Sequence, residues 1–210
     1  MRQLLLLLIV LLQITYAHAQ KLQPGAVSVD FEVNGTALTM RVPPGLNAIT
    51  DPDSLRAFPY PENQNLYFVM KPKSGHESRY VAVGSRPELD ARDISNRTFA
   101  ALGKSFSQDV DSRTLKERIE SFDSLVDKWR AKKGQPGFQA ARTLEAKASD
   151  DILIMTAVVL NEDGSELINC VRMQHVKNRV VVIAVSSRLS TKADIAWVVA
   201  TSNRLEGTIR

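Results

Sequence analysis

The sequence predicts an α+β fold, in which an antiparallel β-sheet is flanked by helices in the manner of an α/β/α sandwich. Three observations favour it. Near the N-terminus, apolar and polar residues alternate on both sides of an Asn-Gly pair. In the middle of the chain, apolar residues recur every three or four positions. The C-terminal third returns to apolar runs divided by short turns, followed by one last amphipathic stretch. Alternation is typical of strands, and the longer period is typical of helices.

The N-terminal segment precedes the predicted fold and has the features of a secretory signal peptide. Arg2 is followed by an unbroken apolar run over residues 4–12, and the small residues Ala17 and Ala19 stand at the minus-three and minus-one positions before Gln20. Export and signal peptidase require such a positive start, a short apolar region and small residues at the cleavage point. We therefore expect cleavage between Ala19 and Gln20 and a mature protein that is periplasmic or secreted.

A membrane anchor is the alternative interpretation of this segment. A spanning helix needs roughly 20 consecutive apolar residues, whereas Gln13, Thr15 and His18 interrupt the apolar run. The single cysteine, Cys170, is far from the cleavage point, so that no cysteine there can accept a lipid. We expect a soluble product without a stable membrane anchor after cleavage.

The first element predicted for the mature chain is an N-terminal β-hairpin over residues 26–42. Apolar residues alternate with polar ones over 27–33, and Asn34 and Gly35 follow before a second strand-like run. Asn-Gly supplies the two positive φ angles of a tight hairpin turn. The Pro-Pro-Gly sequence at 43–45 ends the second strand, because proline cannot donate a ladder hydrogen bond.

A long, proline-bearing connection, residues 43–65, is expected next. It contains one short helical turn at 51–55, which begins with an Asp-Pro pair suited to a helix start. Two strands are predicted after it, over 66–71 and 79–84, because both segments are rich in residues that favour sheets. Connections of this length often carry function, so the segment is a candidate recognition loop.

Two amphipathic helices are predicted in the middle of the chain, one from residue 95 and one from residue 115. Thr114 and Glu117 have the spacing of a capping box at the start of the second helix, and Gly134 follows its end. The apolar stripes that predict the helices consist of Phe99, Leu102, Phe106 and Val110 in the first, and of Leu115, Ile119, Phe122, Val126 and Trp129 in the second. Both stripes are expected to cover the sheet.

The C-terminal third is predicted to form a β-meander and a final helix. The expected strands are 138–147, 151–160, 166–175 and 179–187. Residues 152–160 and 180–185 are apolar on both faces, which predicts central strands covered on two sides. The last helix is expected to begin near Thr191, with Asp194 completing a capping box, and to end at Gly207.

Length and charge limit the class of protein. Loss of a signal peptide at 1–19 from a chain of 210 leaves 191 residues, enough for one core, so we expect a single globular α+β domain over 20–210. The formal charge falls from +4 to +3, because Arg2 is the charged residue that is lost. Basic residues are dispersed among nearly as many acidic ones, whereas a nucleic-acid binder gathers them on one stripe. We expect no nucleic-acid partner, and the sequence does not predict the oligomeric state.

The sequence carries no motif for catalysis, cofactor binding or metal coordination. His76 and His175 would remain after cleavage, and no HExxH, CxxC or paired-histidine spacing is present. We therefore assign no catalytic, cofactor-binding or metal-binding residue and expect no cofactor. Cys170 lies in a predicted strand, where a thiol most often acts as a small buried hydrophobe. A hydrolase with a dispersed Ser/His/Asp-type site is the alternative, and it would use His76 or His175 as its base.

The order of the predicted elements resembles that of the PsbP-like α/β/α sandwich. The resemblance rests on the strand at 33–42 that leads into 43–45, on the helices within 95–133, and on the meander before the last helix. It implies the sandwich fold and carries over no functional residue. A signal peptide, this hairpin and a Trp-bearing last helix are also similar to exported bacterial proteins of no known activity. We therefore expect a noncatalytic binding or accessory protein of the bacterial cell envelope, with an unknown protein or envelope ligand as its partner.

Overall fold

The computed structural model describes residues 28–56, 58, 65–85, 114–148, 152–177 and 179–209. The signal peptide, with Ala17, Ala19 and Gln20 at its expected cleavage point, lies outside the described residues. So does the first of the two predicted amphipathic helices, from residue 95. The export signal and that helix therefore remain predictions.

The predicted N-terminal hairpin is confirmed. Strand β1 (Ser28–Val33) pairs antiparallel with β2 (Thr36–Arg41), and the turn residues Asn34 and Gly35 have φ angles of 45° and 78°. Positive φ at both central positions is what a type I′ turn requires. Burial alternates along β1, so that one side of the hairpin faces the core and the other side faces solvent.

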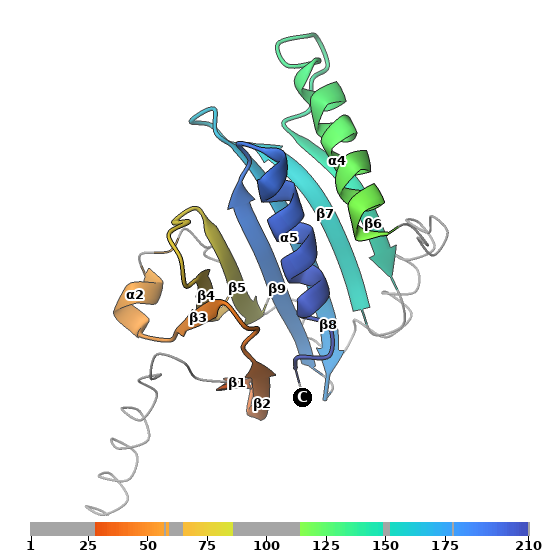
Figure 1. The fold of residues 1–210 in the computed structure, drawn as a ribbon. Coiled ribbons are helices and arrows are strands. Elements are labelled where there is room, and N and C mark those ends of the chain that lie inside the picture. The colour runs from red at the N-terminus through yellow and green to blue at the C-terminus, as the bar shows by residue number, and fades with distance from the viewer. Residues whose placement is uncertain are drawn as a thin grey trace, which may run out of the picture.

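Seven further strands form one antiparallel sheet in the order β3-β4-β5-β9-β8-β7-β6 (Figure 1). The strands are β3 (Leu46–Ile49), β4 (Asn65–Pro72), β5 (Arg79–Ser85), β6 (Ala141–Ala148), β7 (Ile152–Leu160), β8 (Glu166–Val176) and β9 (Arg179–Arg188). The last four form the predicted meander, in which each strand pairs with the next. With the hairpin and the helices, this arrangement confirms the α+β class.

Two details of the sheet differ from the prediction. The expected connection 43–65 contains an edge strand, β3, whose four residues are too few to show alternation. β9 is central, as predicted, but β7 lies second from the edge, and most of its residues are only half-buried. An apolar run predicts a strand, but it does not determine the position of that strand in the sheet.

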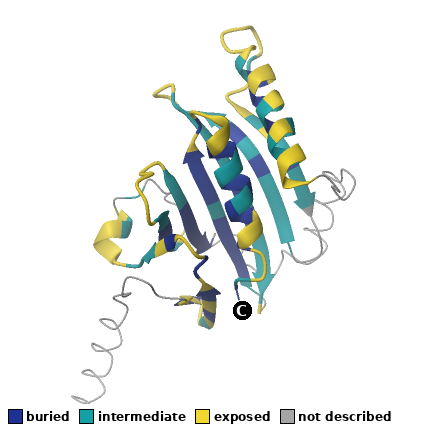
Figure 2. Cartoon of the chain, in the orientation of Figure 1, coloured by how far each residue is buried: buried dark blue, intermediate teal, exposed yellow. Residues whose placement is uncertain are grey.

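In the described parts of the chain, three helices accompany the strands: α2 (Pro52–Arg56), α4 (Leu115–Arg130) and α5 (Lys192–Arg204). The predicted capping box of α4 is present, because the Thr114 amide donates to Glu117 Oε2 at 2.6 Å and the Glu117 amide donates to Thr114 Oγ1 at 3.3 Å. α4 and α5 lie on the same side of the sheet and contact each other (Figure 1). Their outer surfaces are exposed and their sheet-facing sides are buried (Figure 2).

The sheet therefore has a helix side and an opposite side, which can be told apart on β8. Cys170 Sγ lies 3.1 Å from Ser202 Oγ of α5, so alternate residues of β8 from Ile168 onward point to the helix side. The main core lies there and includes the hairpin, whose Phe31 ring contacts Phe68. The opposite side also carries buried apolar residues, namely Val69, Ala82, Val180 and Val182. The sheet is thus apolar on both sides, as the prediction for 180–185 requires.

Candidate functional site

A pocket of about 580 Å³ lies where the N-terminal hairpin meets the end of α5. Two backbone contacts join these segments: the Arg41 amide donates to Thr208 O at 2.8 Å, and Met40 forms an isolated β-bridge with Ile209. The pocket is lined by Ser28, Thr39, Arg41, Pro43, Pro44, Arg204, Glu206, Gly207 and Thr208. Its wall thus combines the first two strands with the C-terminal end of the described chain.

Local structure explains how this wall is built. α5 ends at Arg204, and Gly207, with a φ of 66°, lets the chain turn back toward β2. Thr208 Oγ1 donates to Leu205 O at 2.7 Å, which fixes the turn. On the hairpin, Thr39 Oγ1 donates to Asp30 Oδ1 at 2.6 Å on the outward face. The pocket therefore has ordered walls.

The polar groups of the pocket favour a ligand with negative charge. Arg41 and Arg204 contribute two guanidinium groups, and Glu206 contributes the one carboxylate among the lining residues. Guanidinium groups form their strongest hydrogen bonds with carboxylate and phosphate oxygens. A volume of this size is within the range of small-molecule sites. We therefore treat this surface, the hairpin pocket, as the candidate binding site.

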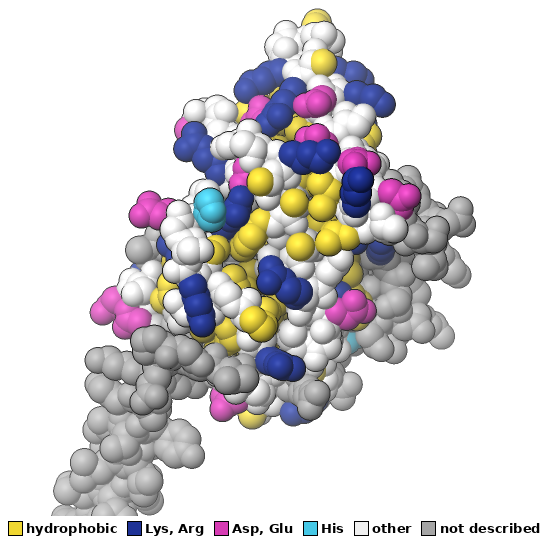
Figure 3. Space-filling view, viewed as in Figure 1, with side chains coloured by type: hydrophobic (Ala, Val, Ile, Leu, Met, Phe, Trp, Pro, Cys, Tyr) yellow, Lys and Arg dark blue, Asp and Glu magenta, His cyan; other side chains and the backbone are white. Residues whose placement is uncertain are grey.

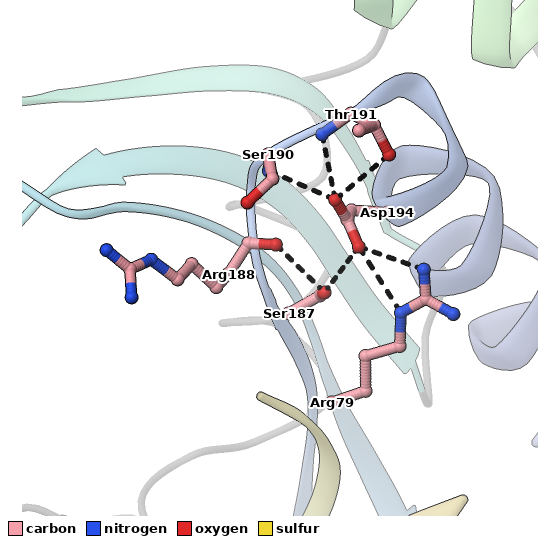
Figure 4. A network of polar contacts seen from close by, with 6 residues as sticks. All are labelled: Arg79, Ser187, Arg188, Ser190, Thr191 and Asp194. Carbon is pink, nitrogen blue, oxygen red and sulfur yellow. Dashed lines mark hydrogen bonds and ion pairs between the residues drawn. The ribbon is translucent and has the colours of Figure 1, made fainter. Parts of the chain in front are cut away.

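A second polar centre joins β5, β9 and α5 through Asp194 (Figure 4). Asp194 Oδ1 accepts from Arg79 Nη2 at 2.9 Å and from Ser187 Oγ at 3.2 Å. Oδ2 accepts from the backbone amides of Ser190 and Thr191 at 3.0 and 2.9 Å. Every oxygen of the carboxylate thus has at least two donors.

Charge and burial in this centre indicate a structural role. The Arg79 and Asp194 side chains are 12% and 10% exposed. Burial alone would raise the pKa of Asp194, but the hydrogen bonds from Arg79 and the two backbone amides outweigh burial and lower this pKa. The Arg79 guanidinium also lies 5.6 Å from the centre of the Trp197 ring. Ser187 meets a carboxylate here, but the third group is an arginine, which cannot act as a base.

The structure places the two histidines far apart. His76 is exposed in the β4–β5 loop, beside the end of β5 at which Arg79 pairs with Ser187. His175 is half-buried near the other end of β8, where it pairs with Val180 and points to the side opposite the helices. Neither histidine lines the hairpin pocket or a smaller pocket beside Trp129.

Cys170 is buried between β8 and α5, as the interpretation of a small buried hydrophobe requires. Burial raises the pKa of its thiol, and the Ser202 hydroxyl lowers this pKa by less. A thiol in such surroundings is disfavoured as a thiolate, the form that reacts. Within the described parts of the chain, no three His, Cys, Asp or Glu residues are grouped so as to hold a metal ion.

Basic residues are spread over the helix side of the molecule, among acidic and apolar ones (Figure 3). The densest basic stretch, residues 128–133, ends α4, and two of its members reach one carboxylate. Arg130 Nε donates to Glu166 Oε2 at 2.7 Å, and Lys133 Nζ lies 3.8 Å from Glu166 Oε1. These ion pairs attach the end of α4 to β8. Among the described helices, none is both long and apolar enough to cross a membrane.

Sequence reasoning missed the hairpin pocket. Its two arginines come from the second strand and the last helix, which are far apart in the sequence, and no motif links them. The one available signal was the Pro-Pro-Gly sequence that ends β2, because Pro43 and Pro44 form part of the wall. The bridge between Met40 and Ile209, which creates the pocket, has no local signature.

Comparison with known proteins gives similarity of structure alone. No protein-family model matches the sequence, and no curated protein matches it. The Ran-binding protein Mog1p of Saccharomyces cerevisiae is 15% identical with a TM-score of 0.42, and the match covers 87% of this chain and 94% of that one. Cyanobacterial PsbP (CyanoP) from Synechocystis is 13% identical with a TM-score of 0.41, and the match covers 89% and 94%. A PsbP protein is thus among the structures to which this chain is similar at low identity, and no residue role is transferred from either protein.

Proposed function

We propose that the protein is an exported, noncatalytic binding or accessory protein of the bacterial cell envelope. The N-terminal segment supports export, because Arg2, the apolar run at 4–12 and the small residues before Gln20 fit a cleavable signal. The hairpin pocket supports binding and is the observation that carries the proposal. Its partner is an anionic envelope ligand or the acidic surface of an envelope protein.

The pocket suits this role because its charged groups are accessible. Arg41, Arg204 and Glu206 are exposed, whereas Pro43 is buried and makes the wall stiff. Two guanidinium groups held on separate elements can donate hydrogen bonds to one anion from two directions. A rigid wall reduces the ordering cost of binding.

The test uses the mature chain, residues 20–210, immobilised and exposed to the envelope fraction of its source. A double variant, Arg41→Ala with Arg204→Ala, removes both guanidinium groups, and Arg188→Ala serves as a matched arginine control on β9. We expect one component to be retained by the wild type and by the control, and to be lost from the double variant. Equal retention by all three proteins would contradict binding at this pocket.

A second arm of the same experiment distinguishes the binding proposal from the alternative, a hydrolase. Generic carboxylic and phosphate esters are offered to the wild type and to the variants His76→Ala and His175→Ala. Turnover that disappears with either histidine would replace the binding proposal by the hydrolase. Fractionation of cells that express the full chain, with Ala19→Asp as a cleavage-defective control, tests export.

A further inference from the structure

A second pocket, of about 410 Å³, lies beside Trp129 at the end of α4. It is formed by the loop that joins α4 to β6, at the top of Figure 1, and by Arg142 of β6. Its volume is toward the low end of the range of small-molecule sites, about 300–1,000 Å³. This surface, the loop pocket, therefore has room for a small ligand.

Aromatic rings and a proline form the apolar part of the loop pocket. The ring centroids of Trp129 and Phe138 lie 5.5 Å apart, and Pro136 is a further lining residue. Trp129 Nε1 donates to Gln139 O at 2.9 Å, so the indole N–H is already satisfied and the indole offers ring surface alone. Phe138 is half-buried. This part of the wall suits an apolar ring.

Hydrogen bonds along the loop hold the pocket in shape. The Lys132 amide donates to Trp129 O at 3.1 Å, and the Gln135 amide donates to Lys132 O at 3.0 Å. The Phe138 amide donates in turn to Gln135 O at 3.1 Å. The side chain of Gln135 folds back on the helix end, where its Nε2 donates to Ala131 O at 3.2 Å. The pocket is therefore largely formed before a ligand arrives, which reduces the ordering cost of binding.

The charged groups of the loop pocket are positive. Lys132 and Arg142 line it, and no lining residue is acidic. The neighbouring cations Arg130 and Lys133 both reach Glu166, whereas no carboxylate of the described residues lies within ion-pair distance of Lys132 or Arg142. A cation just beyond a helix end complements the helix dipole, which accounts for Lys132. Arg142 is half-buried on β6 and has no such explanation.

We propose that the loop pocket binds a carboxylate joined to an apolar ring. The carboxylate accepts from the Arg142 guanidinium and the Lys132 ammonium, and the ring packs beside Phe138 and Trp129. Two carboxylate oxygens match the two cations, since Trp129 Nε1 and Gln135 Nε2 are already in use as donors.

This chemistry has two sources: a free aromatic acid, and the C-terminus of a peptide whose last residue is aromatic. The loop pocket and the hairpin pocket share no residue. The inference therefore does not depend on the proposed function.

The test is calorimetric titration of the mature chain with phenylacetate, acetate and phenylacetamide at constant ionic strength. We expect saturable binding of phenylacetate. Acetate, which lacks the ring, and phenylacetamide, which lacks the charge, should each bind at least about tenfold more weakly. An acetylated Ala-Ala-Phe peptide with a free C-terminus distinguishes the sources: tighter binding than phenylacetate supports a chain terminus, and weaker binding supports a free acid.

Tryptophan fluorescence locates the bound ligand. The chain has two tryptophans, so Trp197→Phe leaves Trp129 as the single emitter. In this variant phenylacetate should change the emission with the dissociation constant that calorimetry gives. Binding that leaves Trp129 emission unchanged would place the ligand elsewhere and contradict the proposal.

Substitutions test the two cations. Arg142→Gln should weaken phenylacetate binding at least about tenfold, since it removes charge-assisted hydrogen bonds, and Lys132→Gln should weaken it as well. Lys128→Gln removes an exposed lysine of α4 that does not line the pocket, and should bind as the wild type does. So should the double variant of the hairpin pocket, Arg41→Ala with Arg204→Ala. The proposal is overturned by a wild type without saturable binding, by unchanged affinity in Arg142→Gln, or by an equal loss in either control.

Discussion

Asp194 is the residue through which three separate parts of the fold are joined. It belongs to α5, it accepts from Arg79 on β5, and it accepts from Ser187 on β9. Its carboxylate also satisfies two backbone amides at the start of α5, at Ser190 and Thr191. Helix capping and tertiary attachment thus depend on one ionised side chain.

We predict that Asp194→Asn lowers the free energy of unfolding at pH 7 by about 3 kcal/mol, because it leaves Arg79 buried without its counter-charge. Urea unfolding monitored by circular dichroism measures the change. Asp53→Asn is the matched control, because Asp53 pairs with Arg56 at the surface, where the side chains are 86% and 81% exposed. Exposed pairs contribute little, so the control should stay within about 0.5 kcal/mol of the wild type.

The pH dependence of the stability of Asp194→Asn tests whether the loss of the ionised carboxylate causes the expected destabilisation. The folded-state pKa of Asp194 is lowered, so the folded state binds fewer protons than the unfolded state, in which an aspartate has a pKa of about 3.9. The contribution of Asp194 is therefore complete above about pH 4 and is lost as the pH falls toward the folded-state pKa. The difference between the wild type and Asp194→Asn should shrink below about pH 4. A difference that stays constant from pH 7 to pH 3 would contradict this explanation.

From the sequence, only those contacts of Asp194 that involve its neighbours along the chain could be predicted. The spacing of Thr191 and Asp194 indicated a helix start, and the structure shows Asp194 accepting from the Thr191 amide. Arg79 is 115 positions away, and nothing in its own neighbourhood identifies its partner.

At the scale of elements, the capping box of α4 gives a quantitative prediction. Thr114→Ala removes the hydroxyl that accepts from the Glu117 amide, and the loss of such a cap costs about 1 kcal/mol. Urea unfolding measures this loss of stability. Ser124→Ala, an exposed change within the same helix, is the control and should alter stability by less than about 0.5 kcal/mol. Equal effects of the two variants would show that the box does not hold the start of α4.

Elements with a local signal were predicted well, and those without one were not. The turn at Asn34-Gly35 requires positive φ, so the hairpin could be located within one or two residues of its observed bounds. The four residues of β3 form a strand only because β4 offers an edge to pair with. The order of strands depends on contacts between distant segments, and this is why the near-edge position of β7 was not foreseen.

At the scale of the whole molecule, the N-terminal hairpin is held by contacts with two distant segments. Arg179, at the start of β9, donates from Nη2 to Asn34 O at 2.8 Å and from Nε to Thr36 Oγ1 at 3.1 Å. The C-terminal segment forms the second attachment through the bridge of Met40 with Ile209. The hairpin lies on the helix side of the sheet and contributes to the same core as α4 and α5. Its attachment to the C-terminal segment also creates the candidate binding pocket, so stability and binding should be coupled there.

This coupling gives the last prediction. Ile209 is 6% exposed, and Ile209→Ala should cost about 2–4 kcal/mol, because a buried aliphatic side chain is replaced by a small one. Native-state hydrogen exchange should show the loss of stability first as faster exchange of the Arg41 amide, which donates to Thr208 O. Leu115→Ala is the control, because Leu115 is 42% exposed and lies on α4, away from the hairpin. Since Arg41 and Thr208 both line the hairpin pocket, Ile209→Ala should also reduce retention of the envelope component. Unchanged exchange at Arg41 would mean that the other contacts of the hairpin, among them those of Arg179 and of Phe31 with Phe68, hold it without the Ile209 side chain.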